Sequence, residues 1–251
     1  MKMSVCVDAL WPKIPCEDAA VLAAGYGAEA IEFWGWWGKN LYAVKKACKE
    51  SGLAVAAICT RFISLVDGQE QEAYLQGLKE TVDAARELHC RTIISRVGKE
   101  LIGVPREVQR SQLIDGLRKA AELISSHDMQ LVIEPLNTRV DHKGYFLWSS
   151  SEAAQIVREV NSPQVKMLFD IYHQQIMEGD ILRHIQENLD CIGHMHCAGV
   201  PGRHSLLESE LDYGYVFKMI DAMGYDGFIG MELFTATPEE EIMRWCRKQA
   251  F

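Results

Sequence analysis

The sequence lacks several features that would place it in large classes of protein. No apolar run approaches the roughly 18 residues that a membrane-spanning helix needs. The N-terminal stretch MKMSVCVDALW has neither a long apolar core nor a small-residue cleavage site. The chain also has no excess of basic residues, because it contains 26 lysines and arginines and 35 aspartates and glutamates, which give a net charge of −9. We therefore expect a cytoplasmic protein that binds neither membranes nor nucleic acid.

The sequence also lacks any Cys-x-x-Cys pair, although it contains eight cysteines. Several of them lie inside apolar runs such as VAAIC and MSVCV, where cysteine behaves as a small buried hydrophobe. This scatter indicates a reducing compartment and argues against a disulfide framework or a zinc cage. Linkers, low-complexity runs and internal repeats are absent too, so we expect one domain over residues 1–251.

What the sequence does contain is a regular alternation of short apolar runs and longer helical patterns. Eight strands are predicted, at residues 3–10, 28–34, 53–59, 91–97, 129–135, 165–170, 191–197 and 226–233. Eight helices are predicted, at residues 16–27, 40–52, 70–89, 105–128, 150–162, 174–189, 213–225 and 237–249. Runs such as Leu131 to Ile133 have no polar alternation, which is typical of parallel strands buried on both faces.

Eight such units of about 31 residues predict a (β/α)8 TIM barrel, an α/β fold. A doubly wound open sheet shows similar units, but eight of them in a chain of this length favour closure. In the fourth helix an apolar stripe is expected at Leu113, Leu117, Ala120, Ala121 and Ile124. Helix ends are expected at Gly25, Gly52, Asn161 and Gly224.

The last four predicted strands each deliver one metal-ligating side chain at or beside the strand end. These are Glu134, Asp170, His196 and Glu232, separated by 36, 26 and 36 residues. A single acidic residue at a strand end is usually a helix cap or a loop anchor, but four successive ones are hard to explain in that way. Catalytic groups of TIM barrels lie at this rim. Three carboxylates and an imidazole suit Mn²⁺, Mg²⁺ or Co²⁺ better than structural zinc.

These residues lie within motifs that resemble a known family. The segments EFWGWW, IEPLN with GYFL, DIYH, GHMH, VPGRH and YDGFIGMEL are similar to the hydroxypyruvate isomerase family of xylose isomerase-like (AP endonuclease 2-like) TIM barrels, which is related to the ketose 3-epimerases. The resemblance implies one divalent metal ion per subunit, held by Glu134, Asp170, His196 and Glu232. It also implies that Glu134 and Glu232 transfer the proton and that His173 and Arg203 contact substrate oxygens.

Departures from the family pattern bear on the substrate. The resemblance leads us to expect Gln where this chain has His196, and an acidic residue in place of Gly199. His at position 196 resembles the 3-epimerases, while GRHSLLESELDY and the strand end CTRF are unusual for a hydroxypyruvate isomerase. We therefore expect a small-molecule substrate, a sugar or a keto acid derived from one.

The expected reaction moves a proton next to a carbonyl through a metal-bound cis-enediolate, with two glutamates as acid and base. A ketose 3-epimerase and a 3-keto-glycoside lyase would use the same site and stay open as alternatives. A non-catalytic sugar-binding barrel stays open as well, as does a homo-oligomer. Metal-dependent cleavage of abasic DNA is disfavoured by the acidic charge and by the shortage of further histidine ligands on the early strands.

Other side chains admit both a functional and a structural interpretation. Trp34 is expected to bind substrate, and Trp36 and Trp37 either wall the same pocket or pack in the core. His142 either covers the site from its loop or is merely solvated. Arg203 either binds substrate or pairs with a surface acid.

Three more residues stand close to the expected site. His194 either supports the site from behind, because it shares a strand face with His196, or is a core histidine. Glu32 and Lys99 either touch substrate or form structural ion pairs.

Overall fold

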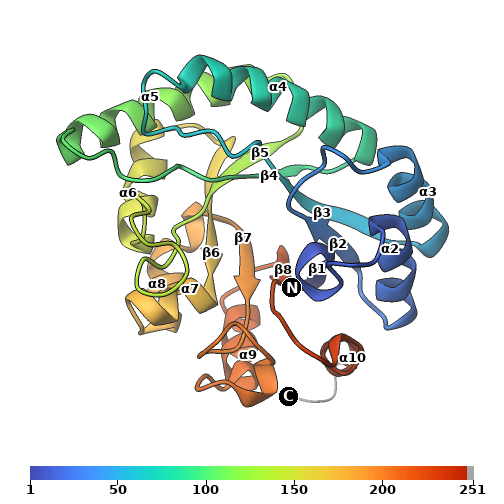
Figure 1. The fold of residues 1–251 in the computed structure, drawn as a ribbon. Helices are drawn as coiled ribbons and strands as arrows, with labels where there is room; N and C mark the ends of the chain where they lie inside the picture. The colour runs from blue at the N-terminus through green and yellow to red at the C-terminus, as the bar shows by residue number, and fades with distance from the viewer. Residues whose placement is uncertain (248–251) are drawn as a thin grey trace.

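The chain forms a closed barrel of eight parallel strands surrounded by helices, as the computed structural model in Figure 1 shows; it describes residues 1–247. The strands follow one another in chain order, and β8 closes the barrel against β1. The strands are β1 (Lys2–Cys6), β2 (Ala30–Phe33), β3 (Ala54–Cys59), β4 (Thr92–Ser95), β5 (Gln130–Ile133), β6 (Val165–Asp170), β7 (Ile192–Cys197) and β8 (Phe228–Met231). The predicted TIM barrel is therefore confirmed.

The helices cover the outside of this barrel (Figure 1). They are α1 (Val7–Leu10), α2 (Cys16–Gly25), α3 (Leu41–Ser51), α4 (Gln71–Leu88), α5 (Arg106–Ile124), α6 (Ser150–Val160), α7 (Ile171–Met177), α8 (Ile181–Asn188), α9 (Tyr213–Ala222) and α10 (Pro238–Cys246). Two short 3₁₀ helices, η1 (Leu189–Cys191) and η2 (Leu206–Glu208), complete the set along residues 1–247. Within that range no helix combines the length and the apolar character needed to cross a bilayer.

Two predicted elements are wrong in their extent. The strand predicted at residues 3–10 ends at Cys6, and the following residues form the single turn α1, because the carboxylate of Asp8 accepts the Trp34 N–H at 2.9 Å and so holds the chain at the rim. The helix predicted at residues 174–189 is two helices, which separate at Gly179 and Asp180 where φ is positive. The helix predicted at residues 237–249 is α10, which ends at Cys246; residues 248 and 249 of that prediction lie outside the described residues.

The expected helix ends are mostly correct. Gly52 and Asn161 take the left-handed conformation directly after α3 and α6, with φ of 71° and 55°. Gly25 is the exception, because it is the last residue of α2 and the left-handed turn lies at Gly27. In α5 the predicted apolar stripe is buried, and fully burying a leucine such as Leu113 stabilises a fold by about 1.5–3 kcal/mol.

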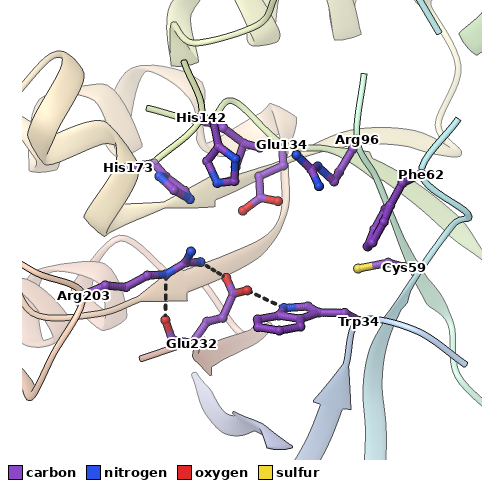
Figure 2. A pocket seen from close by; sticks show the side chains of 10 residues that line it. Trp34, Cys59, Phe62, Arg96, Glu134, His142, His173, Arg203 and Glu232 are labelled. Carbon is purple, nitrogen blue, oxygen red and sulfur yellow. Dashed lines mark hydrogen bonds and ion pairs between the residues drawn. The ribbon is translucent and has the colours of Figure 1, made fainter. Parts of the chain in front are cut away.

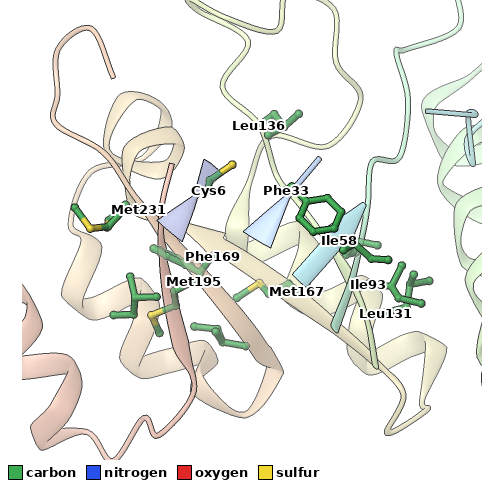
Figure 3. Packing of buried hydrophobic residues seen from close by; sticks show 14 of the residues in the cluster. Cys6, Phe33, Ile58, Ile93, Leu131, Leu136, Met167, Phe169, Met195 and Met231 are labelled. Carbon is green, nitrogen blue, oxygen red and sulfur yellow. The ribbon is translucent and has the colours of Figure 1, made fainter. Parts of the chain in front are cut away.

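Two layers of side chains make up the core. The outer layer lies between strands and helices and includes Phe33, Ile58, Ile93, Leu131 and Phe169, part of which is shown in Figure 3. Because strand residues alternate between faces, the next residues along each strand point into the barrel.

The barrel interior has an apolar side and a polar side. Its apolar side is the separate cluster of Ala57, Cys59, Ile94, Val132 and Leu168 from β3 to β6. Its polar side comes from β1, β2 and β7 and consists of Ser4, Glu32, His194 and His196, all of them buried. The functional rim therefore stands above a charged and hydrogen-bonded half of the barrel.

Candidate active site

Four polar side chains from the last four strands meet at the carboxyl rim of the barrel. Glu134 directly follows β5, Asp170 ends β6, His196 lies in β7 and Glu232 directly follows β8. All four are buried, and one ligand atom from each lies within 4.8 Å of the others. The carboxyl ends of parallel barrel strands share one rim, so the fold brings together the four residues that the sequence singled out.

The ring of His196 stands between carboxylates on both sides. Its Nδ1 lies 2.9 Å from Glu232 Oε2 and 3.7 Å from Glu134 Oε1, while its Nε2 lies 2.9 Å from Glu32 Oε1. These contacts have the length of ion pairs but not the alignment of hydrogen bonds, so both ring nitrogens lack a hydrogen-bond partner among the described residues. Burial opposes the charged ring, yet the carboxylates of Glu32 and Glu232 raise the pKa of His196 well above its usual value.

Glu232 is the most firmly held carboxylate of the site. It accepts hydrogen bonds from Trp34 Nε1 and from Arg203 Nη2, both at 2.5 Å, as the dashed lines in Figure 2 mark. Arg203 also donates from Nε to the main-chain oxygen of Glu232 at 3.1 Å. Burial would raise the pKa of Glu232, but the positive charges of Arg203 and His196 hold that pKa well below its usual value. Glu232 is therefore ionised at neutral pH.

Asp170 combines a structural and a chemical position. Its Oδ1 accepts the main-chain N–H groups of Tyr172 and His173 at 2.8 and 3.3 Å, which caps the start of α7. Its Oδ2 faces the site, 3.8 Å from Arg203 Nη2. Burial raises the pKa of Asp170 to about 7, although Arg203 and His196 act in the opposite direction.

His173 presents a hydrogen-bond donor to the site. Its Nδ1 accepts the main-chain N–H of Asn137 at 3.3 Å and lies 2.7 Å from Asn137 Nδ2, so the ring proton of the neutral form is on Nε2. That Nε2 is buried without a hydrogen-bond partner among the described residues. Burial and the charge of Arg203 lower the pKa of His173 well below its usual value, which keeps the ring neutral.

Glu134, His173, Arg203 and Glu232 are among the residues that line a cavity of about 220 Å³, which opens at the rim. Figure 2 shows their side chains directed into it. The lining residues are Trp34, Cys59, Phe62, Arg96, Glu134, Leu136, His142, His173, Arg203 and Glu232. All four residues expected to touch substrate are among them, namely Trp34, His142, His173 and Arg203. Arg203 pairs with a buried acid of the site and not with a surface acid.

Sequence reasoning missed part of this lining. Arg96 is the first residue after β4, so the strand-end rule that found the carboxylates also applies to it. Phe62 and Leu136 come from the loops after β3 and β5 and carry no comparable signal. Lys99, which the sequence offered near β4, is exposed and does not line this cavity.

The aromatic segment after β2 divides between two roles. Trp34 lines the cavity, as expected. Trp36 instead turns toward α4, where its Nε1 donates to Thr81 Oγ1 at 3.2 Å. The ring of Trp37 packs edge-on against Phe62, with 5.6 Å between ring centroids, and so supports a cavity residue from behind. Of the three tryptophans, one walls the pocket and two pack around it.

Glu32 and His194 form a second buried cluster directly below the rim. Oε2 of Glu32 lies 2.8 Å from His194 Nε2 and accepts a hydrogen bond from Ser4 at 3.1 Å, while Oε1 approaches His196. Glu32 does not line the cavity, so its place is in an ion-pair cluster and not against substrate. His194 stands in the same cluster, behind His196.

The rim residues fit a divalent cation. Oε1 of Glu134 and Nδ1 of His196 are buried without a hydrogen-bond partner among the described residues, and both point into a set of three carboxylates. A buried unpartnered polar atom is costly, and buried like charges repel one another. A cation with oxygen and imidazole ligands removes both costs.

Comparison with known proteins agrees with this fold. The model of the xylose isomerase-like TIM barrel family matches residues 20–249. The chain belongs to this family. Among its xylose isomerase-like relatives, Escherichia coli hydroxypyruvate isomerase is 33% identical over 185 residues, which covers 74% of this chain and 71% of that protein. A 2-oxo-tetronate isomerase from Cupriavidus necator is 41% identical over 123 residues, covering 49% and 47%.

Solved structures of xylose isomerase-like barrels superpose over nearly the whole chain. The crystal structure titled AP endonuclease, family 2 from Brucella melitensis has a TM-score of 0.91 at 28% identity and covers 99% of both chains. A D-allulose 3-epimerase from Methylomonas sp. has a TM-score of 0.81 at 16% identity, covering 98% of this chain and 90% of that one, and shares the fold. The resemblance to hydroxypyruvate isomerases inferred from the motifs is confirmed, and the likeness to a ketose 3-epimerase is confirmed at the level of the fold.

Proposed function

We propose that this protein is a metal-dependent isomerase of sugars or sugar acids that moves a proton between two carbons next to a carbonyl. The proposal rests on one observation: Glu134 and Glu232 line one cavity, and each offers a ligand atom within 4.8 Å of those of Asp170 and His196. The isomerase names of the relatives, on hydroxypyruvate and 2-oxo-tetronate, support the same reaction class.

The four rim residues would hold one divalent ion, Mn²⁺, Mg²⁺ or Co²⁺. Such an ion supplies Lewis-acid stabilisation of the negative charge that develops on oxygen when the proton leaves carbon. Neutral His173 adds a hydrogen bond from Nε2 to that oxygen, and this donor is already oriented by Asn137.

The two glutamates differ in what surrounds them, which suits different steps. Glu232 is ionised and fixed by Arg203 and Trp34, so it is oriented to accept a proton from carbon. Glu134 lines the same cavity, and its Oε1 has no hydrogen-bond partner among the described residues. It is therefore able to return the proton to carbon or to accept the proton of a substrate hydroxyl. Trp34, Phe62 and Leu136 exclude water from the reacting carbon.

Epimerisation at carbon 3 of a ketose and elimination next to a ketone begin with the same proton abstraction. Both reactions therefore stay open as alternatives for this site. The third alternative is a protein that binds a sugar without turnover. A screen of hydroxypyruvate, four-carbon 2-oxo acids, ketoses and 3-keto sugars with metal-supplemented protein separates them. The isomerase proposal fails if no 2-oxo acid or ketose is isomerised.

The acid and base roles are tested with Glu232→Gln and Glu134→Gln. Each keeps the side-chain shape but removes a base, so we expect turnover to fall by at least ~10²-fold while metal still binds. Deuterium exchange at the substrate carbon in D₂O, followed by NMR, shows which glutamate removes the proton. If the glutamates serve different carbons or faces, one variant will still exchange deuterium without forming product. Full turnover in either variant would falsify its assignment as a base.

A further inference from the structure

Arg96 is a cation of the cavity wall for which the part of the chain that the structure describes provides no acidic partner. It is the first residue after β4, is partly buried and lines the cavity together with Glu134 and His142. Among the described residues no carboxylate lies within ion-pair distance of its guanidinium, and the guanidinium donates no hydrogen bond. Figure 2 shows Arg96 and Arg203 entering the cavity from opposite sides.

The contrast with Arg203 is informative. Arg203 forms ion pairs with Glu232 at 2.5 Å and with Asp170 at 3.8 Å, so acidic side chains of the protein balance its positive charge. Within residues 1–247, no group accepts a hydrogen bond from the guanidinium of Arg96. A cation that lines a ligand cavity without a counterion favours a ligand that brings a negative charge.

Arg96 is held in position by aromatic rings, which leave its N–H donors free. Its Cζ lies 5.1 Å from the ring centroid of Phe62 and 5.8 Å from that of Tyr145. Tyr145 is itself fixed, because its hydroxyl accepts the main-chain N–H of Val97 at 2.7 Å. Contacts of this kind orient the plane of a guanidinium.

The charge of Arg96 also acts on His142, another residue that lines the cavity. Burial lowers the pKa of His142, and the charge of Arg96 lowers it further. The charge of Arg96 therefore acts on a second residue of the cavity lining.

We propose that Arg96 binds the carboxylate of the substrate and makes this enzyme selective for 2-oxo acids over neutral ketoses. The inference rests on the proposed isomerase function and names the group that selects its substrate. A guanidinium binds a carboxylate through two parallel N–H···O bonds, which a hydroxymethyl group cannot accept in the same way.

Matched substrate pairs test this selectivity. Hydroxypyruvate and dihydroxyacetone differ only in a carboxylate against a hydroxymethyl group, and so do 2-oxo-tetronate and erythrulose. For Arg96→Met we expect kcat/KM on the acids to fall by about 10- to 100-fold, the scale of a hydrogen bond to a charged group, with little change on the neutral ketoses. Arg96→Lys restores part of the loss because it keeps the charge without the planar fork.

Arg61→Met is the matched control. Arg61 also lies against aromatic rings, 5.1 Å from Trp36, but it pairs with Glu80 and does not line the cavity. We expect this variant to keep the wild-type preference for acids. An equal loss on acids and neutral ketoses in Arg96→Met, or no loss on either, overturns the proposal.

Binding measured without turnover separates this inference from the proposed function. Calorimetry with each substrate pair on metal-loaded Glu134→Gln, which keeps the ion pair of Arg203 with Glu232, compares affinities with Arg96 present and with Arg96→Met added. Preference for the acid that disappears with Arg96→Met supports the carboxylate site even if the wild-type protein isomerises neither compound. Isomerisation with equal affinity for acid and ketose overturns the Arg96 assignment and leaves the isomerase proposal standing.

Discussion

Replacing Glu32 with glutamine tests whether the buried cluster below the rim controls the proposed metal ligand His196. Glu32 is 2% exposed, and although burial opposes its charge, the neighbouring His196 and His194 lower its pKa to about 2. The carboxylate is therefore ionised, with Oε2 lying 2.8 Å from His194 Nε2 and Oε1 lying 2.9 Å from His196 Nε2. When a metal ion displaces the proton of His196 Nδ1, we expect Glu32 to keep the remaining proton on Nε2, so that the lone pair of Nδ1 faces the ion between Glu134 and Glu232.

Glutamine keeps the size of the side chain but loses the charge and one acceptor. If its NH₂ group takes the place of Oε1, it faces the Nε2–H of His196 and favours the other tautomer, with the proton on the ligating Nδ1. Partners of this kind on a metal-bound histidine change metal affinity by about 10- to 100-fold. We therefore expect Glu32→Gln to weaken binding of Mn²⁺ or Co²⁺ by that factor, or about 1.4–2.7 kcal/mol.

The assay is competition with a chelator of known affinity, together with the visible spectrum of the Co²⁺ form, which reports a change of ligand. Ser4→Ala is the matched control, because Ser4 donates to Oε2 of the same carboxylate and does not touch His196. It removes one hydrogen bond, worth about 1 kcal/mol of stability, and leaves metal affinity unchanged. A folded Glu32→Gln protein with wild-type metal affinity and an unchanged Co²⁺ spectrum would refute the reasoning.

Three further predictions follow from the same site. Removing metal with EDTA lowers the melting temperature, by about 5–10 °C when metal had been present at 100 times its Kd, and unchanged melting with unchanged turnover contradicts a resident ion. Asp170→Asn weakens metal affinity more than His173→Ala, because the first loses a proposed ligand and the second a substrate contact; calorimetry that finds equal losses contradicts the assignment. Gly230→Ala lowers the free energy of unfolding in urea by about 1–3 kcal/mol because a Cβ there overlaps Glu32, whereas Gly25→Ala, with open space around it, does not; equal effects contradict this packing argument.

The fold and the rim residues were predictable because each rests on a short-range signal. Strand and helix periods are local, and a residue at the end of a parallel barrel strand faces the same rim whatever the loop lengths are. That rule is sufficient to predict that Glu134, Asp170, His196 and Glu232 lie together at the rim. The same rule applies to Arg96, but a lone basic residue at a strand end, unlike a set of carboxylates and an imidazole, does not indicate a metal site.

Other features depend on three-dimensional placement that the sequence does not carry. The cluster of Glu32 with His194 joins residues 162 positions apart and needs the register across β2, β1, β8 and β7. The division of roles between Trp34 and Trp36 depends on which way the chain turns after β2. The break between α7 and α8 comes from left-handed residues, of which only Gly179 is marked by its residue type.

The polar half of the barrel interior also constrains the order in which the protein can be completed. Glu32 is synthesised early, on β2, while the histidines that neutralise it arrive on β7, the strand before last. Until then its burial would place an uncompensated carboxylate in an apolar interior, which costs several kcal/mol. A nascent chain that has not reached β7 therefore keeps this side of the barrel open to water. The charged interior thus makes closure of an incomplete barrel unfavourable. As a consequence, the site assembles only when the last two strands are present.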